Sequence, residues 1–263
     1  MIPKVIHYCW FGGKKKSKLI LDCILSWKEN MPDYEIIEWN ETNSDLSHPF
    51  VKAAYRLKKG AFVSDFIRFK VLFENGGIYL DTDMMVIKPI DNLLENECFF
   101  GIEDKDFISA GIIGTIQRHD FIKKCFDSFD NIKIDSTTDF NLIALPLIIT
   151  SCFRNHYKFR SSFDEFKKTL GIKIYPISFF YPLPNNKKYD IKNFKSYIEE
   201  STFAVHLWNA SWVEYNEFDY IKNRKYNKAF YQIFCSVFFE NKLNLFYLKR
   251  VVRSFLNVIK NKK

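Results

Sequence analysis

The stretch GGIYLDTDMMV, residues 76–86, restricts the fold more than any other part of this chain. Two glycines precede a short apolar run, which is typical of a buried strand that begins at a sharp turn. Asp81 and Asp83 follow at the end of this run, one residue apart. Two carboxylates at the edge of a buried strand repel one another unless a cation or hydrogen bonds compensate their charge.

The spacing of the two aspartates predicts a cation site. In an extended strand, the side chains of Asp81 and Asp83 point to the same side, so they can face one hard divalent ion. Oxygen ligands of this kind suit Mg²⁺ or Mn²⁺, which commonly bridge to the phosphate oxygens of a bound nucleotide. The alternative interpretation is a solvated acidic turn that holds no ion.

The order of the predicted elements indicates an α/β fold. A strand over residues 2–11, a helix over 17–30 and a strand over 34–39 are typical of a nucleotide-binding α/β layer, in which ligands bind beyond the carboxyl ends of the strands. Further helices are predicted over residues 50–59, 61–75, 120–129 and 141–153, and further strands over 78–80, 98–102, 111–116, 172–175 and 202–207. We find no internal repeat or linker, so we expect one domain over residues 1–239 and a tail over 240–263.

The predicted helix over residues 61–75 carries an unusual pair of charges. Asp65 and Arg68 lie three residues apart, hence on one face of a helix that is otherwise rich in phenylalanine. The pair is directed towards the strand that ends in the two aspartates. It is either part of a functional site or an internal salt bridge.

These segments together resemble a known family. The motif SDxxR at residues 64–68, followed by GGxYxDxD at residues 76–83, resembles the DXD sugar-transferase signature of glycosyltransferase family 32. The opening IPKVIHYCWFGG and the late segment HLWNASW are similar to that family's first strand and its late metal-binding loop. The resemblance covers residues 2–212 and implies a GT-A type fold, a Rossmann-like nucleotide-binding mixed sheet flanked by helices.

The resemblance also implies a role for individual residues. Asp81 and Asp83 would hold Mn²⁺ or Mg²⁺ against the diphosphate of a nucleotide-sugar, and His206 would add a metal ligand, unless it is a hydrogen-bonded structural histidine. Asp65 and Arg68 would contact the donor sugar or ribose and complete the catalytic set with the two aspartates. The other implied donor-binding residues are Trp10, which would pack on the base, Phe11, Gly12, Tyr79, Thr82, Ser211 and Trp212.

The implied reaction moves a sugar from a UDP- or GDP-sugar to a surface glycan, such as a capsule, a lipopolysaccharide or a lipid-linked oligosaccharide. Negative charge develops on the departing β-phosphate, where a divalent ion and a guanidinium stabilise it. The family is of the retaining type. The sequence offers no convincing carboxylate for a covalent nucleophile, which leaves a front-face substitution as an alternative.

Two other functions fit parts of the sequence. A phosphatase of the haloacid dehalogenase type also places DxD at a strand end, but that family normally continues with a small β-branched or hydroxyl residue, whereas Met84 and Met85 follow here. A non-catalytic, membrane-attached glycan-binding protein would use the carboxylates to hold a structural ion. The latter hypothesis leaves the Asp65–Arg68 pair unexplained.

The positive charge is concentrated in the tail. The chain has a net charge of +8, and residues 240–263 contain seven basic residues and one acidic residue. A helix here places Leu245, Leu248, Val251, Val252, Phe255 and Ile259 on one side, and Lys249, Arg250, Arg253 and Lys260 on the other. This pattern is typical of an interfacial helix on an anionic membrane, or of a terminal helix packed on the domain with a solvated basic face. No nucleic-acid-binding motif accompanies the charge, so we expect no nucleic acid as a partner.

The remaining features concern location. No segment approaches the roughly 18 to 20 apolar residues that span a bilayer, and the basic cluster at residues 14–16 follows the first apolar run, unlike in a signal peptide. The six cysteines are scattered, which is typical of reduced core thiols. We therefore expect a cytoplasmic protein, peripheral at the inner face of the cell membrane.

Overall fold

The computed structural model describes the whole chain except residues 164–167, 170, 210–216, 223, 239–242 and 261–263. The chain forms two compact units, residues 1–209 and residues 210–263.

The N-terminal unit is built on a mixed sheet of seven strands in the order β2-β1-β3-β6-β5-β8-β7. The strands are β1 (Val5–Cys9), β2 (Glu35–Trp39), β3 (Gly77–Leu80), β5 (Cys98–Asp104), β6 (Phe107–Thr115), β7 (Lys168–Thr169) and β8 (Ile172–Tyr175). The pairs β1·β2, β1·β3 and β5·β8 are parallel, whereas β3·β6, β5·β6 and β7·β8 are antiparallel. Two short strands, β4 (Met84–Val86) and β9 (Ala204–His206), pair separately. The predicted mixed α/β sheet is confirmed.

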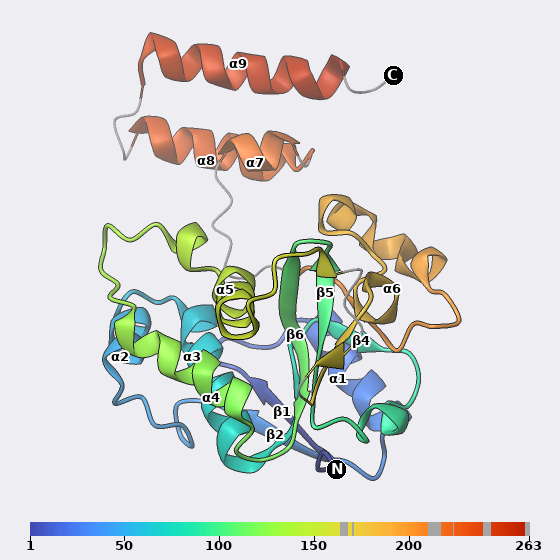
Figure 1. The fold of residues 1–263 in the computed structure, drawn as a ribbon. Coiled ribbons are helices and arrows are strands. Elements are labelled where there is room, and N and C mark those ends of the chain that lie inside the picture. Colours follow the sequence, from blue (N-terminus) through green and yellow to red (C-terminus); the bar gives the residue numbers. More distant parts are fainter. Residues whose placement is uncertain (164–167, 170, 210–216, 223, 239–242, 261–263) are drawn as a thin grey trace. The chain divides into compact units, whose positions relative to one another are not determined.

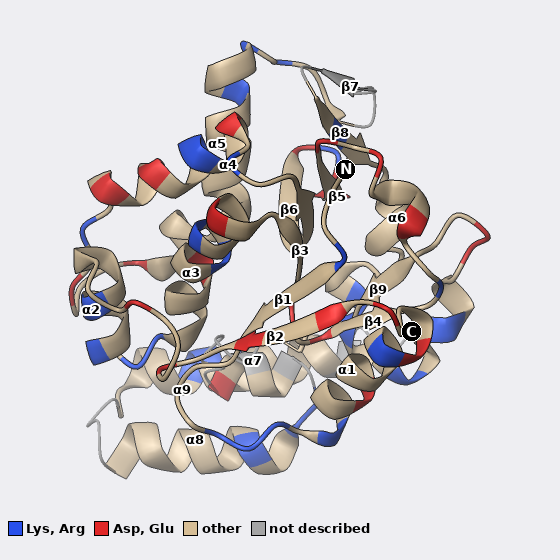
Figure 2. Ribbon diagram, turned by 90° about the horizontal axis from the view of Figure 1, so that it is seen from below, with Lys and Arg blue, Asp and Glu red and all other residues tan. Residues whose placement is uncertain are grey.

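Helices cover both faces of this sheet (Figure 1). They are α1 (Lys18–Asn30), α2 (Pro49–Arg56), α3 (Gly60–Asn75), α4 (Asp120–Asp127), α5 (Leu145–Tyr157) and α6 (Ile177–Phe180), with short 3-10 segments at Asp91–Leu93, Ser128–Asn131, Phe140–Ile143 and Asn185–Tyr197. Figures 1 and 2 agree that α1 and α3 lie on opposite sides of the sheet. In one core cluster, α2, α3, α4 and α5 pack on one face of the sheet. In a second cluster, α1, α6 and β4 pack on the other face. Apolar burial on both faces is the main stabilising term of such a layered fold.

A tight connection between α3 and β3 fixes the strand that carries the aspartates. Gly76 and Gly77 have φ angles of 68° and 96°, which explains why glycine is needed. A Cβ atom on Gly77 would lie 2.7 Å from the carbonyl oxygen of Val5. His7 is buried, and its Nε2 lies 3.0 Å from the carbonyl oxygen of Gly76. The indole N–H of Trp39 donates to His7 Nδ1 at 3.1 Å. β3 is therefore held against β1 through close backbone contact.

The observed elements agree with the predicted ones except in a few places. Strand β4 was not predicted, because its three residues are too few to show an alternating pattern. β6 begins at Phe107, four residues before the predicted start. The aromatic segment around Pro176 contains the short helix α6, and its Phe180 and Tyr181 are buried in the core.

The C-terminal unit contains three described helices, α7 (Glu217–Lys222), α8 (Tyr226–Phe238) and α9 (Leu245–Lys260). The tail is helical over α9, as predicted. Its contacts group it with α7 and α8, so the compact unit begins at residue 210 and not at residue 240. No helix in the described ranges is both long and apolar enough to cross a membrane.

Candidate active site

The two aspartates occupy the turn between β3 and β4. All four residues of β3 are buried, and the strand ends where the backbone N–H of Asp81 donates to the carbonyl oxygen of Gly111 at 2.8 Å. The N–H of Met84 then donates to the carbonyl oxygen of Asp81 at 2.9 Å. The segment is thus a turn and not the extended strand that we expected. The turn nevertheless brings both carboxylates towards one point.

Asp83 is held in place by the C-terminal end of β9. The antiparallel pairing sets Met84 opposite His206, so the imidazole Nε2 lies 3.1 Å from Oδ1 of Asp83. The backbone N–H of Asn209 donates to Oδ2 at 2.6 Å, and that of Leu207 donates to the Asp83 carbonyl oxygen at 2.9 Å. Burial alone would raise the pKa of Asp83, but His206 and the hydrogen bond from the Asn209 N–H hold the pKa below its usual value. Asp83 is therefore an ionised and rigidly oriented ligand candidate.

Arg68 compensates the other aspartate. Its Nη2 lies 2.9 Å from Oδ1 of Asp65 and 3.2 Å from Oδ1 of Asp81, and its Nη1 donates to the carbonyl oxygen of Ala110 at 2.8 Å. The guanidinium also lies over the Tyr79 ring, 4.4 Å from its centroid. Burial raises the pKa of Asp65 to about 7, with Arg68 opposing that rise and Asp81 adding to it. The predicted pair is thus an internal salt bridge that reaches the aspartate turn.

Three side chains could hold a divalent ion. Asp81, Asp83 and His206 each present one ligand atom, and these atoms lie within 4.8 Å of one another. His206 Nδ1 is buried and has no hydrogen-bond partner within the described structure. The pKa of His206 is raised, since Asp83 outweighs the lowering effect of burial. Two carboxylates and one imidazole suit Mn²⁺ or a similar ion, so the residues present fit the implied metal.

The implied donor-binding residues after β1 lie in a loop. The partly buried Trp10 donates its indole N–H to the carbonyl oxygen of Lys14 at 2.7 Å, and Lys16 Nζ lies 5.3 Å from its ring centroid. Gly12 is exposed, has a φ of 92°, and donates its N–H to Glu41 at 2.6 Å. Phe11 is partly buried next to Gly60.

The other implied donor-binding residues differ in accessibility. Tyr79 is only 2% exposed, so its ring supports Arg68 within the protein. Thr82 is partly exposed between the two aspartates. Ser211 and Trp212 lie outside the described residues.

The structure adds residues to the site that sequence reasoning had not assigned. Glu103, on β5, interacts with Ser109 on β6 and is close enough to Asp81 and His206 for electrostatic coupling, and burial raises its pKa. The Tyr181 hydroxyl accepts a hydrogen bond from the Ile112 N–H at 3.2 Å. These groups form a polar wall beside the aspartate turn. A Cβ atom at Gly111 would lie 3.1 Å from the Tyr181 hydroxyl, closer than ordinary van der Waals contact, so the backbone here packs tightly against Tyr181.

Trp208 is a further residue that sequence reasoning had not assigned to the site. It has a φ of 52°, which is costly for a side chain of this size, and its ring centroid lies 4.1 Å from that of His206. Its indole N–H donates to the carbonyl oxygen of Leu183 at 2.6 Å. The strained backbone and this hydrogen bond together fix the ring beside the metal-ligand candidate. Only its place in the late segment HLWNASW pointed to it in the sequence.

Comparisons with known proteins agree with this geometry. Residues 17–100 match the family model described as the glycosyltransferase sugar-binding region containing the DXD motif. The chain is 27% identical over 162 residues to lactosylceramide 4-alpha-galactosyltransferase of Rattus norvegicus, which covers 56% of this chain and 40% of that protein. It is 24% identical over 200 residues to alpha-1,4-N-acetylglucosaminyltransferase of Homo sapiens, covering 70% of this chain and 51% of that protein. The chain thus spans about half or less of the length of these curated relatives.

A solved structure supports the fold. The PaToxG glycosyltransferase superimposes with a TM-score of 0.50 at 17% identity, covering 60% of this chain and 70% of that one. The GT-A type fold is therefore confirmed. The resemblance to DXD sugar transferases is confirmed by the family model and by the relatives, which are named as glycosyltransferases.

Proposed function

Because the chain carries the DXD-containing sugar-binding region of glycosyltransferases, we propose that it is a metal-dependent enzyme that transfers a sugar from a nucleotide-sugar to a glycan acceptor. The observation that carries this proposal is the convergence of Asp81, Asp83 and His206 within 4.8 Å of one another, next to the buried Arg68. Mn²⁺ or Mg²⁺, when bound there, would stabilise the negative charge of a departing nucleoside diphosphate.

Individual residues would have different roles in this reaction. Asp83 is fixed by His206 and by a backbone N–H, so it would hold the ion in one position. Arg68 is a preoriented guanidinium beside Asp81 and would add positive charge near the leaving phosphate, where charge develops in the transition state. Trp10 and the loop at Gly12 would bind the UDP or GDP portion.

The resemblance and the residues of the site together suggest a stereochemical course for the reaction. The resemblance implies retention of configuration at the transferred sugar. The sequence offers no convincing carboxylate for a covalent nucleophile, and Glu103 interacts with Ser109, so we favour a front-face substitution. Glu103, which is partly exposed and interacts with the buried Ser109, would then orient the sugar or the attacking hydroxyl.

The acceptor that we propose is a lipid-linked or surface glycan, such as a capsule or lipopolysaccharide precursor. The names of the relatives support a lipid-linked glycan, since one acts on lactosylceramide and another, from Saccharomyces cerevisiae, is a mannosyl phosphorylinositol ceramide synthase, 29% identical over 150 residues that cover 51% of this chain and 36% of that protein. We place the reaction at the inner face of the cell membrane, with the enzyme peripheral and not embedded.

The first experiment is thermal denaturation with a panel of nucleoside diphosphates and nucleotide-sugars, each with and without Mn²⁺. The wild type and Asp83→Ala are compared with Asp22→Ala, which removes an exposed carboxylate on α1 outside the site. We expect one nucleotide to stabilise the wild type and Asp22→Ala only when metal is present, and Asp83→Ala to lose that effect. Stabilisation of Asp83→Ala equal to that of the wild type would contradict the proposed metal site.

Turnover separates the proposed enzyme from the two alternatives. Release of the nucleoside diphosphate from the selected donor, in the presence of a glycolipid acceptor, is expected for a transferase. Glycan binding without turnover of any donor would favour a non-catalytic glycan-binding protein. Hydrolysis of simple phosphate esters without use of a nucleotide-sugar would favour a phosphatase.

A further inference from the structure

The C-terminal unit carries almost all of the net charge. Residues 210–263 contain eleven lysines and arginines and four aspartates and glutamates, so their net charge is +7 of the +8 of the whole chain. The N-terminal unit, which holds the candidate active site, is close to neutral. The excess of positive charge therefore belongs to a compact structural unit and not only to the end of a tail.

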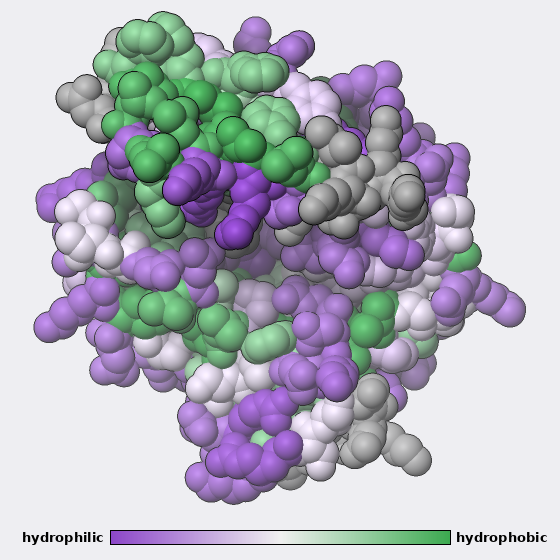
Figure 3. Space-filling model, turned by 90° about the horizontal axis from the view of Figure 1, so that it is seen from above, coloured by the Kyte–Doolittle hydropathy of each residue, from purple (hydrophilic) through white to green (hydrophobic). Residues whose placement is uncertain are grey.

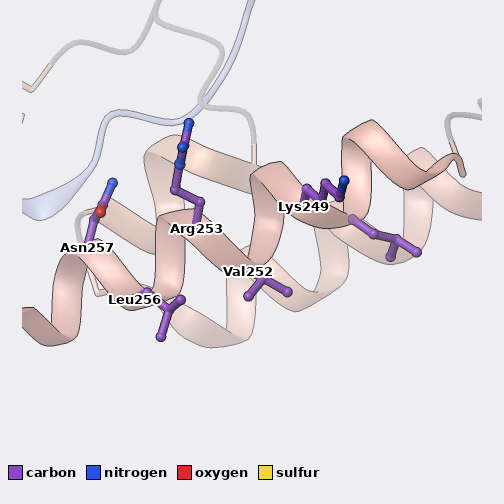
Figure 4. Close-up of a pocket in the computed structure, with 6 residues that line it drawn as sticks. Lys249, Val252, Arg253, Leu256 and Asn257 are labelled. Atoms are coloured by element: carbon purple, nitrogen blue, oxygen red, sulfur yellow. The ribbon is translucent and has the colours of Figure 1, made fainter.

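Helix α9 presents apolar and basic side chains in adjacent rows. Leu248, Val252 and Leu256 follow one another at intervals of four residues and are 47%, 56% and 50% exposed. Lys249 and Arg253 line the same surface groove. Figure 4 shows Val252 and Leu256 on one side of the α9 ribbon, and Arg253 on the other. Val251 and Phe255, which we had placed on the apolar side, are less exposed than this row.

Helix α8 extends this surface with aromatic rings. Phe230, Tyr231 and Phe238 are 59%, 69% and 67% exposed. The ring of Phe230 stacks on Phe255 of α9, with centroids 5.8 Å apart, and so does Tyr226, at 6.0 Å. The exposed residues of the two helices therefore belong to one apolar surface. Figure 3 shows apolar side chains gathered over this unit, with hydrophilic side chains at their border.

We propose that the surface formed by α8 and α9 docks on an anionic lipid bilayer. The charge of the unit favours a bilayer over a second copy of the protein as the binding partner. A second copy of the unit would also carry +7 and would be repelled, whereas anionic headgroups attract Lys249 and Arg253. The ring of Tyr231, with its polar hydroxyl, is suited to the headgroup level, and the phenylalanine and aliphatic side chains to the acyl boundary. The docking element is thus a two-helix platform, larger than the tail predicted from the sequence. This inference does not depend on the donor or acceptor chemistry.

The test is co-sedimentation of the full chain with vesicles of phosphatidylcholine, with and without phosphatidylglycerol. One variant, Lys249→Gln/Arg253→Gln, removes the charge of the basic row. A second, Val252→Asp/Leu256→Asp, disrupts the apolar row. The matched control is Leu21→Asp/Leu25→Asp, because these leucines are 53% and 50% exposed on α1 of the other unit.

We expect the wild type and the α1 control to bind phosphatidylglycerol vesicles and to release them at high salt. Since each basic residue near an anionic surface changes binding about fivefold, the charge variant should bind about 25-fold more weakly. The apolar variant should not sediment with either vesicle, while its circular dichroism remains that of the wild type.

Three results would overturn the inference. The first is equal binding of both vesicle types, and the second is sedimentation of the α9 variants that equals that of the wild type. The third is a concentration-dependent dimer, seen by analytical ultracentrifugation, that Val252→Asp/Leu256→Asp dissociates while vesicle binding is absent, because the occupant of the surface would then be a second copy.

Discussion

Replacing Arg68 with methionine tests whether its guanidinium is the counter-charge of the buried Asp65 carboxylate and the partly exposed Asp81 carboxylate. The side chain of Arg68 is 6% exposed, and its Nη2 contacts Asp65 at 2.9 Å and Asp81 at 3.2 Å. Removal of one partner from a buried ion pair costs about 3–5 kcal/mol, since the other charge is left uncompensated. We therefore expect the free energy of unfolding of Arg68→Met to fall by about that amount, measured by urea denaturation with EDTA at pH 9, well above the pKa of about 7 of Asp65 in the wild type.

The double variant Asp65→Asn/Arg68→Met separates this effect from lost packing. Methionine keeps much of the apolar stem, and asparagine removes one of the two charges that Arg68 balances. The double variant should therefore be more stable than the sum of the single changes predicts, by about 1–3 kcal/mol. The matched control is the Lys70–Glu74 pair on the same helix, whose side chains are 24% and 49% exposed. The coupling of that exposed pair should be about 0.3–0.5 kcal/mol. Additivity within about 0.5 kcal/mol at Asp65 and Arg68 would refute the reasoning.

Three further predictions concern residues around the aspartate turn. Gly77→Ala should lower the free energy of unfolding by at least about 2 kcal/mol in urea, because its φ is 96° and the added Cβ would lie 2.7 Å from the Val5 carbonyl oxygen; a neutral change would contradict the close approach. Burial lowers the pKa of His7 to about 4, so between pH 7 and pH 5 the unfolded chain binds a proton at His7 that the native protein does not bind. Over this range the free energy of unfolding of the wild type should fall by about 2 kcal/mol more than that of His7→Gln, and equal decreases would contradict the buried, neutral state of the ring. Asp83→Asn should abolish stabilisation by Mn²⁺, which at a hundred times its dissociation constant gives the wild type about 2.7 kcal/mol; an unchanged shift in melting temperature would exclude Asp83 as a ligand.

The sequence predicted the Asp65–Arg68 pair because helical geometry is local. Residues three apart on a helix share a face, whatever the rest of the chain does. The acidic end of β3 was likewise readable, since the run from Gly76 to Asp83 contains both the turn residues and the strand. Each of these features depends on neighbours within a few residues.

The partners across the site depend on long-range pairing, which the sequence does not encode in any short pattern. His206 reaches Asp83 across 123 positions because β9 pairs with β4 in a particular register. Each of these strands has three residues, too few to specify a register by alternation. The family resemblance, and not the spacing, pointed to His206. Tyr181 could not be singled out, because the whole aromatic segment that contains it packs in the core.

Two carboxylates one residue apart are tolerated at the end of a buried strand because separate cations compensate them. Asp83 is 8% exposed and takes its hydrogen bonds from β9 and the residues after it, where His206 provides a positive charge when protonated. Asp81 is more exposed and is balanced from the opposite direction by Arg68 on α3. If Asp81, Asp83 and His206 together held a divalent ion, the coordinating nitrogen of His206 would be unprotonated, and Asp81 would be shared between the ion and Arg68. The site is therefore held together without the ion, yet its two ligands differ: Asp83 is fixed, and the charge of Asp81 is divided between an internal guanidinium and whatever occupies the site.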